Sequence, residues 1–131
     1  LGVDVKIQNQ EWSVFIQNRN KLNYQIARGG WSADYNDPMT FLDMWTTGNG
    51  NNNAGYANPA YDSLIQAAKT ETDPAKRMED FAKAEKILVQ DDMVLLPIYY
   101  YSNVSLTKPN VKDIGLDFSG AIDFTRAYIT Q

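Results

Sequence analysis

Three pairs in which an aspartate or asparagine precedes a proline constrain the fold of this chain more than any other feature. The pairs are Asp37-Pro38, Asn58-Pro59 and Asp73-Pro74. Proline fits the first position of a helix, because that position needs no N–H donor and the ring fixes φ near the helical value. The preceding side-chain oxygen can accept hydrogen bonds from free N–H groups of the first turn. Each pair therefore predicts the start of a helix.

Two of these predicted helices carry an apolar stripe at the helical spacing of three and four residues. The stripes are Tyr61, Leu64, Ile65 and Ala68 in the first helix, and Met78, Phe81, Ala84 and Leu88 in the second. One apolar face is typical of a helix that packs against the core of a globular protein. We expect both stripes to be buried.

Other segments have the pattern of strands. Apolar and polar residues alternate over residues 3–8, residues 23–31 close on Gly29-Gly30, and residues 93–107 are rich in β-formers, with Pro97 indicating an edge or a bend. One helical face between the first two segments is formed by Trp12, Phe15, Ile16 and Arg19. The mixture predicts an α/β fold, in which helices flank a mixed sheet.

Residues 46–57 are rich in glycine and asparagine. These residue types favour turns, so we interpret the segment as a polar surface loop. Sugar binding through its asparagines is the alternative interpretation.

The composition excludes several kinds of chemistry. The 131 residues include no cysteine and no histidine, which excludes a Ser-His-Asp triad, a cysteine nucleophile and an ordinary zinc site. The formal net charge is −4 and the pI is about 4.7, whereas nucleic-acid-binding proteins normally present a clustered basic surface. We therefore predict no metal site and no nucleic-acid partner, and a function that depends on carboxylates, guanidinium groups and aromatic rings.

The length and the first residues bear on domain organisation. A chain of 131 residues can bury a core without disulfides or metals, and the sequence has no internal repeat or domain boundary. It begins at Leu1, directly before an alternating segment, and lacks the pattern of a signal peptide there. We expect it to be a piece of a longer protein.

Charged and aromatic residues between Trp12 and Asp37 form the candidate site. Arg19 lies on the predicted apolar helix face, where a guanidinium group needs an anion. Arg28 lies at a predicted strand end, where open α/β sheets bind ligands. Asp34 lies between two aromatic residues in a short loop, which suits the binding of a cation. For either arginine, an internal salt bridge or a solvent-exposed head group is the alternative.

Segments along nearly the whole chain match one known family. They are NQEW at 9–12, Arg19, ARGGWSADYNDP at 27–38, NPAYD at 58–62, AKAE at 82–85, PIYYY at 97–101 and Lys108-Pro109. In them the chain resembles the C-terminal third of bacterial oligopeptide-binding proteins, the extracellular solute-binding proteins of family 5. The resemblance implies part of one lobe of a type II periplasmic-binding-protein fold, with residues 1–102 mostly in one lobe and residues 103–131 crossing toward the other.

The same resemblance implies a peptide-binding site. Asp34 matches the aspartate that grips the α-ammonium group of the peptide, and Arg28 matches the arginine that helps to hold its carboxylate end. The other matched residues belong to side-chain pockets, to the region around the ligand's C-terminus or to the cleft, and they are Trp12, Trp31, Arg19, Ser32 and Tyr101.

The implied function is the extracellular capture of oligopeptides, held by their charged termini in a cleft between two lobes, and their delivery to the permease of an ABC importer. No bond is made or broken, so we expect no enzymatic activity and no cofactor. The location implied is the periplasm, or the cell surface as a lipoprotein. The alternatives are a carbohydrate-active domain that uses Asp34 and Asp37, and an interaction domain without a small ligand. Residues 114–129 are expected to leave a sheet edge that can pair with another copy.

Overall fold

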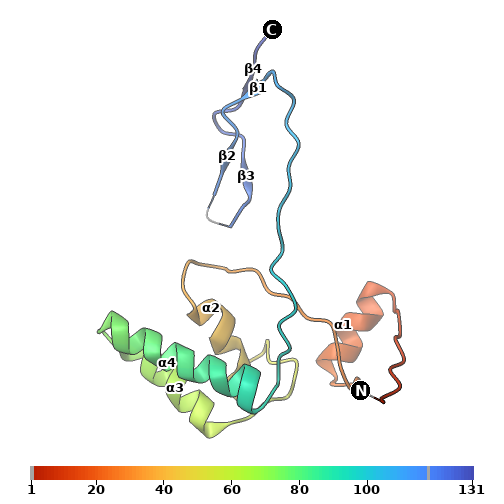
Figure 1. The fold of residues 1–131 in the computed structure, drawn as a ribbon, viewed down its shortest axis with the longest axis vertical. Coiled ribbons are helices and arrows are strands. Elements are labelled where there is room, and N and C mark those ends of the chain that lie inside the picture. The colour runs from red at the N-terminus through yellow and green to blue at the C-terminus, as the bar shows by residue number, and fades with distance from the viewer. Residues whose placement is uncertain (1, 118) are drawn as a thin grey trace.

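The computed structural model describes residues 2–117 and 119–131, and these form an N-terminal helix, a helical unit and two short antiparallel ladders (Figure 1). The helical elements are α1 (Trp12–Asn20), α2 (Met39–Leu42), the 3-10 turn η1 (Asp43–Trp45), α3 (Pro59–Thr70), α4 (Pro74–Lys86) and the π-helical turn η2 (Ile87–Asp91). The strands are β1 (Val111–Lys112), β2 (Gly115–Leu116), β3 (Ile122–Asp123) and β4 (Tyr128–Ile129). Within the described residues, no helix combines the length and the apolar character needed to cross a membrane.

The hydrophobic core lies in residues 39–91, which we call the helical unit. Here α3 packs along α4, and α2 packs on α4 (Figure 1). The buried core residues are Met39, Leu42, Tyr61, Ile65, Ala68, Phe81, Ala84 and Leu88. The Tyr61 hydroxyl donates a hydrogen bond to the Leu42 carbonyl oxygen at 2.6 Å, which satisfies the one polar atom of this buried ring. Burial raises the pKa of Tyr61 well above its ordinary value, so the phenol stays neutral.

The predicted helix starts are confirmed at two of the three proline pairs. The side chains of Asn58 and Asp73 each accept hydrogen bonds from two N–H groups of the first turn, and the prolines that follow stand in that turn. At the third pair the helix begins one residue later than predicted, at Met39, and Pro38 occupies the cap position.

The predicted apolar stripes are buried or partly buried except at Met78, whose side chain is exposed. Arg77 takes its place on that face of α4. The Arg77 guanidinium lies 4.6 Å from the centroid of the Phe81 ring, and its Nε donates to the Ala68 carbonyl oxygen at 2.9 Å. Since residues 77, 81, 84 and 88 share one helical face, Met78 is turned about 100° away from it.

The three strands predicted in residues 3–8, 23–31 and 93–107 are wrong for the described residues. The structure has no strand in residues 3–8, 23–31 or 93–107. Most of their apolar side chains reach the solvent instead, with exposed fractions from 73% to 98% for Val3, Val5, Ile7, Ile26, Ile98 and Tyr100, whereas Val94 and Leu95 are partly buried against the core. Alternation shows which face of a strand could be buried, but a strand also needs a neighbour that accepts its backbone hydrogen bonds.

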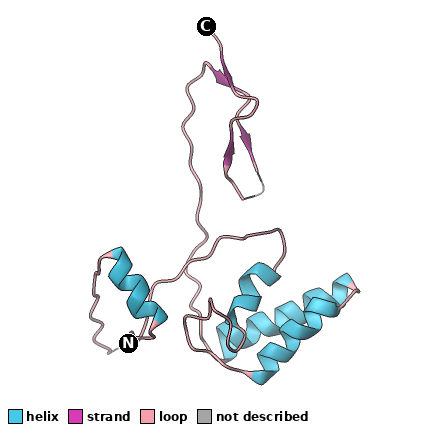
Figure 2. Cartoon of the chain, turned by 180° about the vertical axis from the view of Figure 1, so that it is seen from behind, coloured by secondary structure: helices cyan, strands magenta, loops and turns pink. Residues whose placement is uncertain are grey.

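The sheet is consequently much smaller than predicted. It consists of two separate ladders, in which β1 pairs with β4 and β2 pairs with β3, both antiparallel. Viewed from behind, these strands lie beyond a long extended segment that leaves the helical unit after η2 (Figure 2). The mixed helix and sheet composition agrees with the predicted fold class, although the described strands are short.

The loop at residues 46–57 is held by its own asparagines. The Asn52 amide nitrogen lies 3.3, 3.1 and 2.7 Å from the carbonyl oxygens of Trp45, Thr46 and Tyr56, and its Oδ1 accepts the Tyr56 N–H at 3.1 Å. Asn49 donates to the Asp43 carbonyl oxygen at 3.1 Å. These amides shape the turn, which argues against the sugar-binding interpretation of the loop.

The segment that follows α1 docks on this loop. The Tyr24 hydroxyl donates to the Asn53 carbonyl oxygen. Gly55 has φ +62°, and a Cβ atom there would lie 2.7 Å from Leu22 Cδ1. Glycine is favoured at this position, because the left-handed backbone strains any residue with a side chain and a Cβ atom would also displace the Leu22 methyl group.

Candidate functional site

Asp34 is exposed, and the structure fixes it through Thr40 of α2. The Asp34 N–H donates to Thr40 Oγ1 at 3.1 Å, and the same hydroxyl oxygen lies 3.4 Å from Asp34 Oδ2. Thr40 itself is buried, with 3% of its surface exposed. Across residues 2–117 and 119–131 no lysine or arginine forms an ion pair with Asp34. The carboxylate is therefore anchored while its charge remains available to a ligand.

Asp37, by contrast, is engaged within the fold. Arg77 of α4 binds it through both terminal nitrogens, at 2.6 and 2.9 Å, and Asp37 Oδ1 also accepts the Met39 N–H at 2.9 Å. The hydrogen bonds from Arg77 hold the pKa of Asp37 below its ordinary value. A glycosidase acid needs a raised pKa. The geometry therefore gives no support to a catalytic pair of Asp34 and Asp37. Asp37 was predicted to be the cap residue of the helix, but Pro38 occupies that position, and the Asp37 side chain accepts one N–H of the first turn, that of Met39.

Arg28 contacts a residue far along the chain. Its Nη2 donates to the Tyr101 hydroxyl oxygen. The Tyr101 ring packs edge-on against Tyr99, with centroids 4.9 Å apart and planes at 60°. Hydrogen bonding with Tyr99 and the charge of Arg28 lower the pKa of Tyr101, and Tyr101 raises the pKa of Arg28. Two predicted site residues are thus brought together, although Arg28 lies in an extended segment and not at a strand end.

Arg19 and Trp12 lie on α1 with Phe15 between them. The rings of Trp12 and Phe15 are 5.7 Å apart, and the Arg19 guanidinium lies 5.8 Å from the Phe15 centroid. None of the nine residues of α1, all of them described, is buried. On the face predicted to be packed, Trp12 is exposed, whereas Phe15, Ile16 and Arg19 are partly buried. Arg19 Nε is shielded from solvent but has no hydrogen-bond partner among the described residues. This nitrogen is a donor that the described fold does not use.

Trp31 and Ser32 are exposed residues that lead into Asp34. The predicted residues therefore lie in three separate groups. Asp34 lies close in sequence to Trp31 and Ser32, Arg28 contacts Tyr101, and Arg19 lies on α1 with Trp12. The contacts of Thr40 with Asp34 and of Tyr99 with Tyr101 were missed from the sequence, as was the ion pair between Arg77 and Asp37. Tyr99 had a detectable signal, because residues 99 and 101 lie on the same side of an extended segment.

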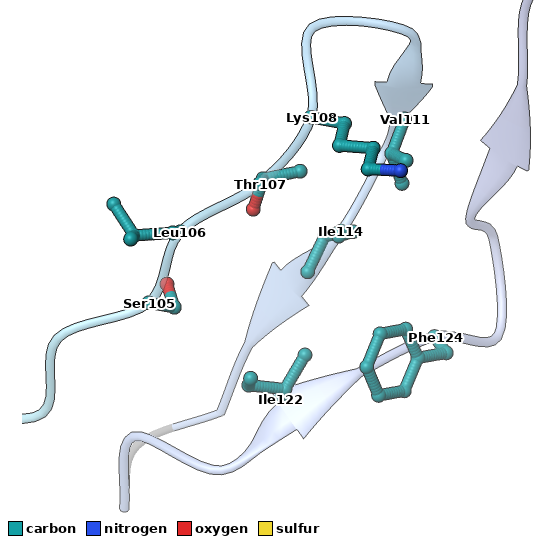
Figure 3. Close-up of a pocket in the computed structure, with 8 residues that line it drawn as sticks. All are labelled: Ser105, Leu106, Thr107, Lys108, Val111, Ile114, Ile122 and Phe124. Atoms are coloured by element: carbon teal, nitrogen blue, oxygen red, sulfur yellow. The ribbon is translucent and has the colours of Figure 1, made fainter.

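A pocket of about 300 Å³ lies away from these residues, among the strands (Figure 3). Ile114, Ile122 and Phe124 lie across from the extended segment 105–108. None of the predicted peptide-binding residues lines it.

Comparison with known proteins identifies the chain's relatives. Residues 1–53 match the family described as bacterial extracellular solute-binding proteins, family 5 Middle. The oligopeptide-binding protein OppA of Bacillus subtilis (strain 168) is 41% identical over 129 residues, which cover 98% of this chain and 24% of that protein. The periplasmic murein peptide-binding protein MppA of Escherichia coli (strain K12) is 40% identical over 132 residues, covering 100% of this chain and 24% of the relative.

A solved structure gives the same result for the fold. The crystal structure of an oligopeptide ABC transporter substrate-binding domain from Bacillus anthracis str. Ames matches with a TM-score of 0.85 and 35% identity, over 99% of this chain and 26% of that one.

The fold and the sequence together are those of part of a lobe in the type II periplasmic-binding-protein fold. More specifically, the chain belongs to family 5 of the bacterial extracellular solute-binding proteins. It spans about a quarter of the length of the curated relatives it matches. The predicted family is thereby confirmed.

Proposed function

We propose that the whole protein represented by this chain binds oligopeptides outside the cytoplasm and delivers them to the permease of an ABC importer, with no catalytic step. One observation carries the proposal. Asp34 is exposed and anchored through Thr40, yet has no cationic partner among residues 2–117 and 119–131, whereas nearby Asp37 is bound by Arg77. A fixed carboxylate with an available charge suits the α-ammonium group of a peptide.

The relatives support the substrate class and the location. Their names describe binding of oligopeptides and of murein peptide, the second in the periplasm, and the similar solved structure is described as part of an oligopeptide ABC transporter. For this protein we infer the same side of the membrane, as a periplasmic protein or a lipoprotein at the cell surface.

Arg28 would hold the carboxylate end of the peptide. Its present partner is the Tyr101 hydroxyl oxygen, and a carboxylate can accept two parallel, charge-assisted hydrogen bonds from a guanidinium group. When the carboxylate takes that place, the Tyr101 hydroxyl is able to donate to the same anion. Arg19 has a shielded Nε donor without a partner in the described chain, and with the exposed Trp12 and Trp31 it would shape pockets for the peptide's side chains.

The charged ends of the peptide gain most from a closed site. We propose that residues 1–102 belong mostly to one lobe, and that residues 103–131 cross toward the other lobe. Closure of two lobes removes water and strengthens the ion pairs at Asp34 and Arg28. This chain alone is expected to bind peptide weakly, because each ion pair stays in solvent and contributes at most about 1 kcal/mol.

The test is calorimetric titration of the full-length protein with tetraalanine, N-acetyl-tetraalanine and a chitooligosaccharide. We expect tetraalanine to bind and the acetylated peptide to bind far more weakly. In Asp34→Asn, the binding free energy of tetraalanine should fall by roughly 2–5 kcal/mol, the cost of removing one partner of a desolvated charge pair. Equal affinity for the two peptides would overturn the role of Asp34. Binding of the oligosaccharide without either peptide would overturn the proposed function.

A further inference from the structure

Thr40 is the one polar residue among the buried side chains that the structure describes, and its hydroxyl forms hydrogen bonds with Asp34. A hydroxyl in the interior needs a partner, since an unsatisfied buried group costs free energy. Thr40 Oγ1 accepts the Asp34 N–H at 3.1 Å and lies 3.4 Å from Asp34 Oδ2. The hydroxyl therefore faces both the backbone and the carboxylate of one exposed residue.

The position of Thr40 is fixed by its neighbours in α2 and by a backbone hydrogen bond. It lies in α2 between Met39 and Leu42, which are both core residues. Its N–H donates to the Asp37 carbonyl oxygen at 3.2 Å, and the Asp37 side chain is bound by Arg77. The loop that carries Asp34 is thus joined to the helical unit at two points: one through the Thr40 hydroxyl and the other through the ion pair to α4.

We propose that Thr40 is a positioning residue for the ammonium-binding carboxylate of Asp34, an inference that rests on the proposed function. The hydroxyl restricts the Asp34 backbone and side chain to one arrangement before the ligand arrives. A ligand ammonium group then need not immobilise the carboxylate itself, which lowers the entropic cost of binding. The effect is confined to ligands that present a charged amine to Asp34.

A purely structural role for Thr40 predicts something different. Destabilising α2 would lower the affinity for every peptide by the same factor, whatever the chemistry of the peptide's N-terminus. Positioning of Asp34 instead changes the ratio of affinities for free-amine and N-acetylated peptides. The ratio is therefore the decisive measurement.

The variant that tests this is Thr40→Val in the full-length protein, because valine keeps the shape of threonine and removes the hydroxyl. Thr40→Ser restores the hydroxyl. Thr70→Val is the matched control, because Thr70 is exposed at the end of α3 and its hydroxyl donates, among the described residues, to the nearby Ala67 carbonyl oxygen alone. Calorimetry with tetraalanine and N-acetyl-tetraalanine gives the affinity ratio for each variant.

We expect Thr40→Val to reduce the preference for the free amine about tenfold, the factor that corresponds to one hydrogen bond involving a charged group. Thr40→Ser should recover most of the preference, and Thr70→Val should leave it unchanged. An unchanged ratio in Thr40→Val, with the parent still preferring the free amine, would overturn the positioning role and leave the proposed function standing. A parent that binds neither peptide would overturn both.

Hydrogen exchange supplies a measurement that needs no ligand. The Asp34 amide should exchange faster in Thr40→Val than in the parent, because its acceptor is lost, while amides of α3 and α4 keep their protection. Faster exchange throughout the helical unit would instead indicate general loosening and would contradict the positioning role.

Discussion

The helical unit and the extended segments on either side of it differ in where their packing partners come from. In the helical unit, α3 and α4 follow one another in the sequence and bury each other's apolar stripes. Residues 3–8 and 96–107 also carry many apolar side chains, yet these side chains are exposed. The apolar stripe of a helix is readily buried when the next helix along the chain packs against it. A segment with the pattern of a strand instead needs a neighbouring strand, which can lie anywhere in the sequence.

The largest effect should come from removing the same side chain in each region. Ile65 is 1% exposed and Ile98 is 82% exposed. Ile65→Ala is expected to lower the free energy of unfolding of this chain by about 2–5 kcal/mol, because it leaves a cavity in the core. Ile98→Ala should change it by less than about 0.5 kcal/mol. Urea unfolding followed by circular dichroism measures both, and comparable losses would contradict the division into two regions.

A smaller effect is expected at the junction of the two regions, where Asp37 binds Arg77. Asp37→Asn removes the charge and keeps the shape, and it should destabilise the chain by about 1–2 kcal/mol at pH 7, allowing for partial exposure of both side chains. Because the pKa of Asp37 is lowered in the folded chain, its contribution is complete above the unfolded pKa of about 3.9 and is lost as pH falls through the lower folded pKa.

The stability difference between the parent and Asp37→Asn should therefore be constant from pH 7 to about 5 and should shrink below pH 4. Glu79→Gln is the control, since Glu79 pairs with Lys83 on the exposed face of α4 and should have a much weaker effect. A difference that grows as the solution is acidified would show that the ion pair is not its source.

The contact between Arg28 and Tyr101 joins the two extended segments, and its effect should appear in ligand selectivity. In the full-length protein, Arg28→Ala is expected to lower the affinity for tetraalanine. The affinity for the C-terminal amide of the same peptide should be nearly unaffected. Tyr101→Phe keeps the ring and the guanidinium charge, so it should reduce the preference for the free acid only in part. If amidation changes the affinity equally in the parent and in Arg28→Ala, the carboxylate is held elsewhere.

The smallest effect concerns the strands at residues 111–129. Each of the two described ladders has two strands, so each of its strands keeps one edge without a neighbouring strand, and unpaired edges favour association between copies. Light scattering on this chain should show weak, concentration-dependent dimers that Ile129→Lys suppresses, since Ile129 is exposed and lysine on an edge discourages pairing. If the chain is monomeric at every concentration tested, the prediction of self-association through these strands is wrong.

The sequence predicted best where its signals were local. The caps at Asn58 and Asp73 need only their own first turn, and their helices form as predicted. Met78 was misplaced because helical spacing alone does not reveal that Arg77 has an acceptor at Ala68. In the site, Asp34 and Arg28 were chosen from residue type and family resemblance.

The contacts that hold these two residues were not predictable in the same way. Thr40 lies six positions after Asp34, and Tyr101 lies 73 positions after Arg28. Nothing in composition or periodicity links residues so placed. Their connection is a property of the tertiary arrangement.

The contact between Leu22 and Gly55 has a consequence for how the sequence can vary. Leu22 itself adopts φ +56°, an unfavourable conformation for a leucine, and its methyl group occupies the space that a Cβ at position 55 would need. The two positions should therefore show epistasis. Gly55→Ala is expected to be better tolerated in a Leu22→Ala background than in the parent, so a mutational scan of pairs should find them coupled, with substitutions at one site conditional on the other.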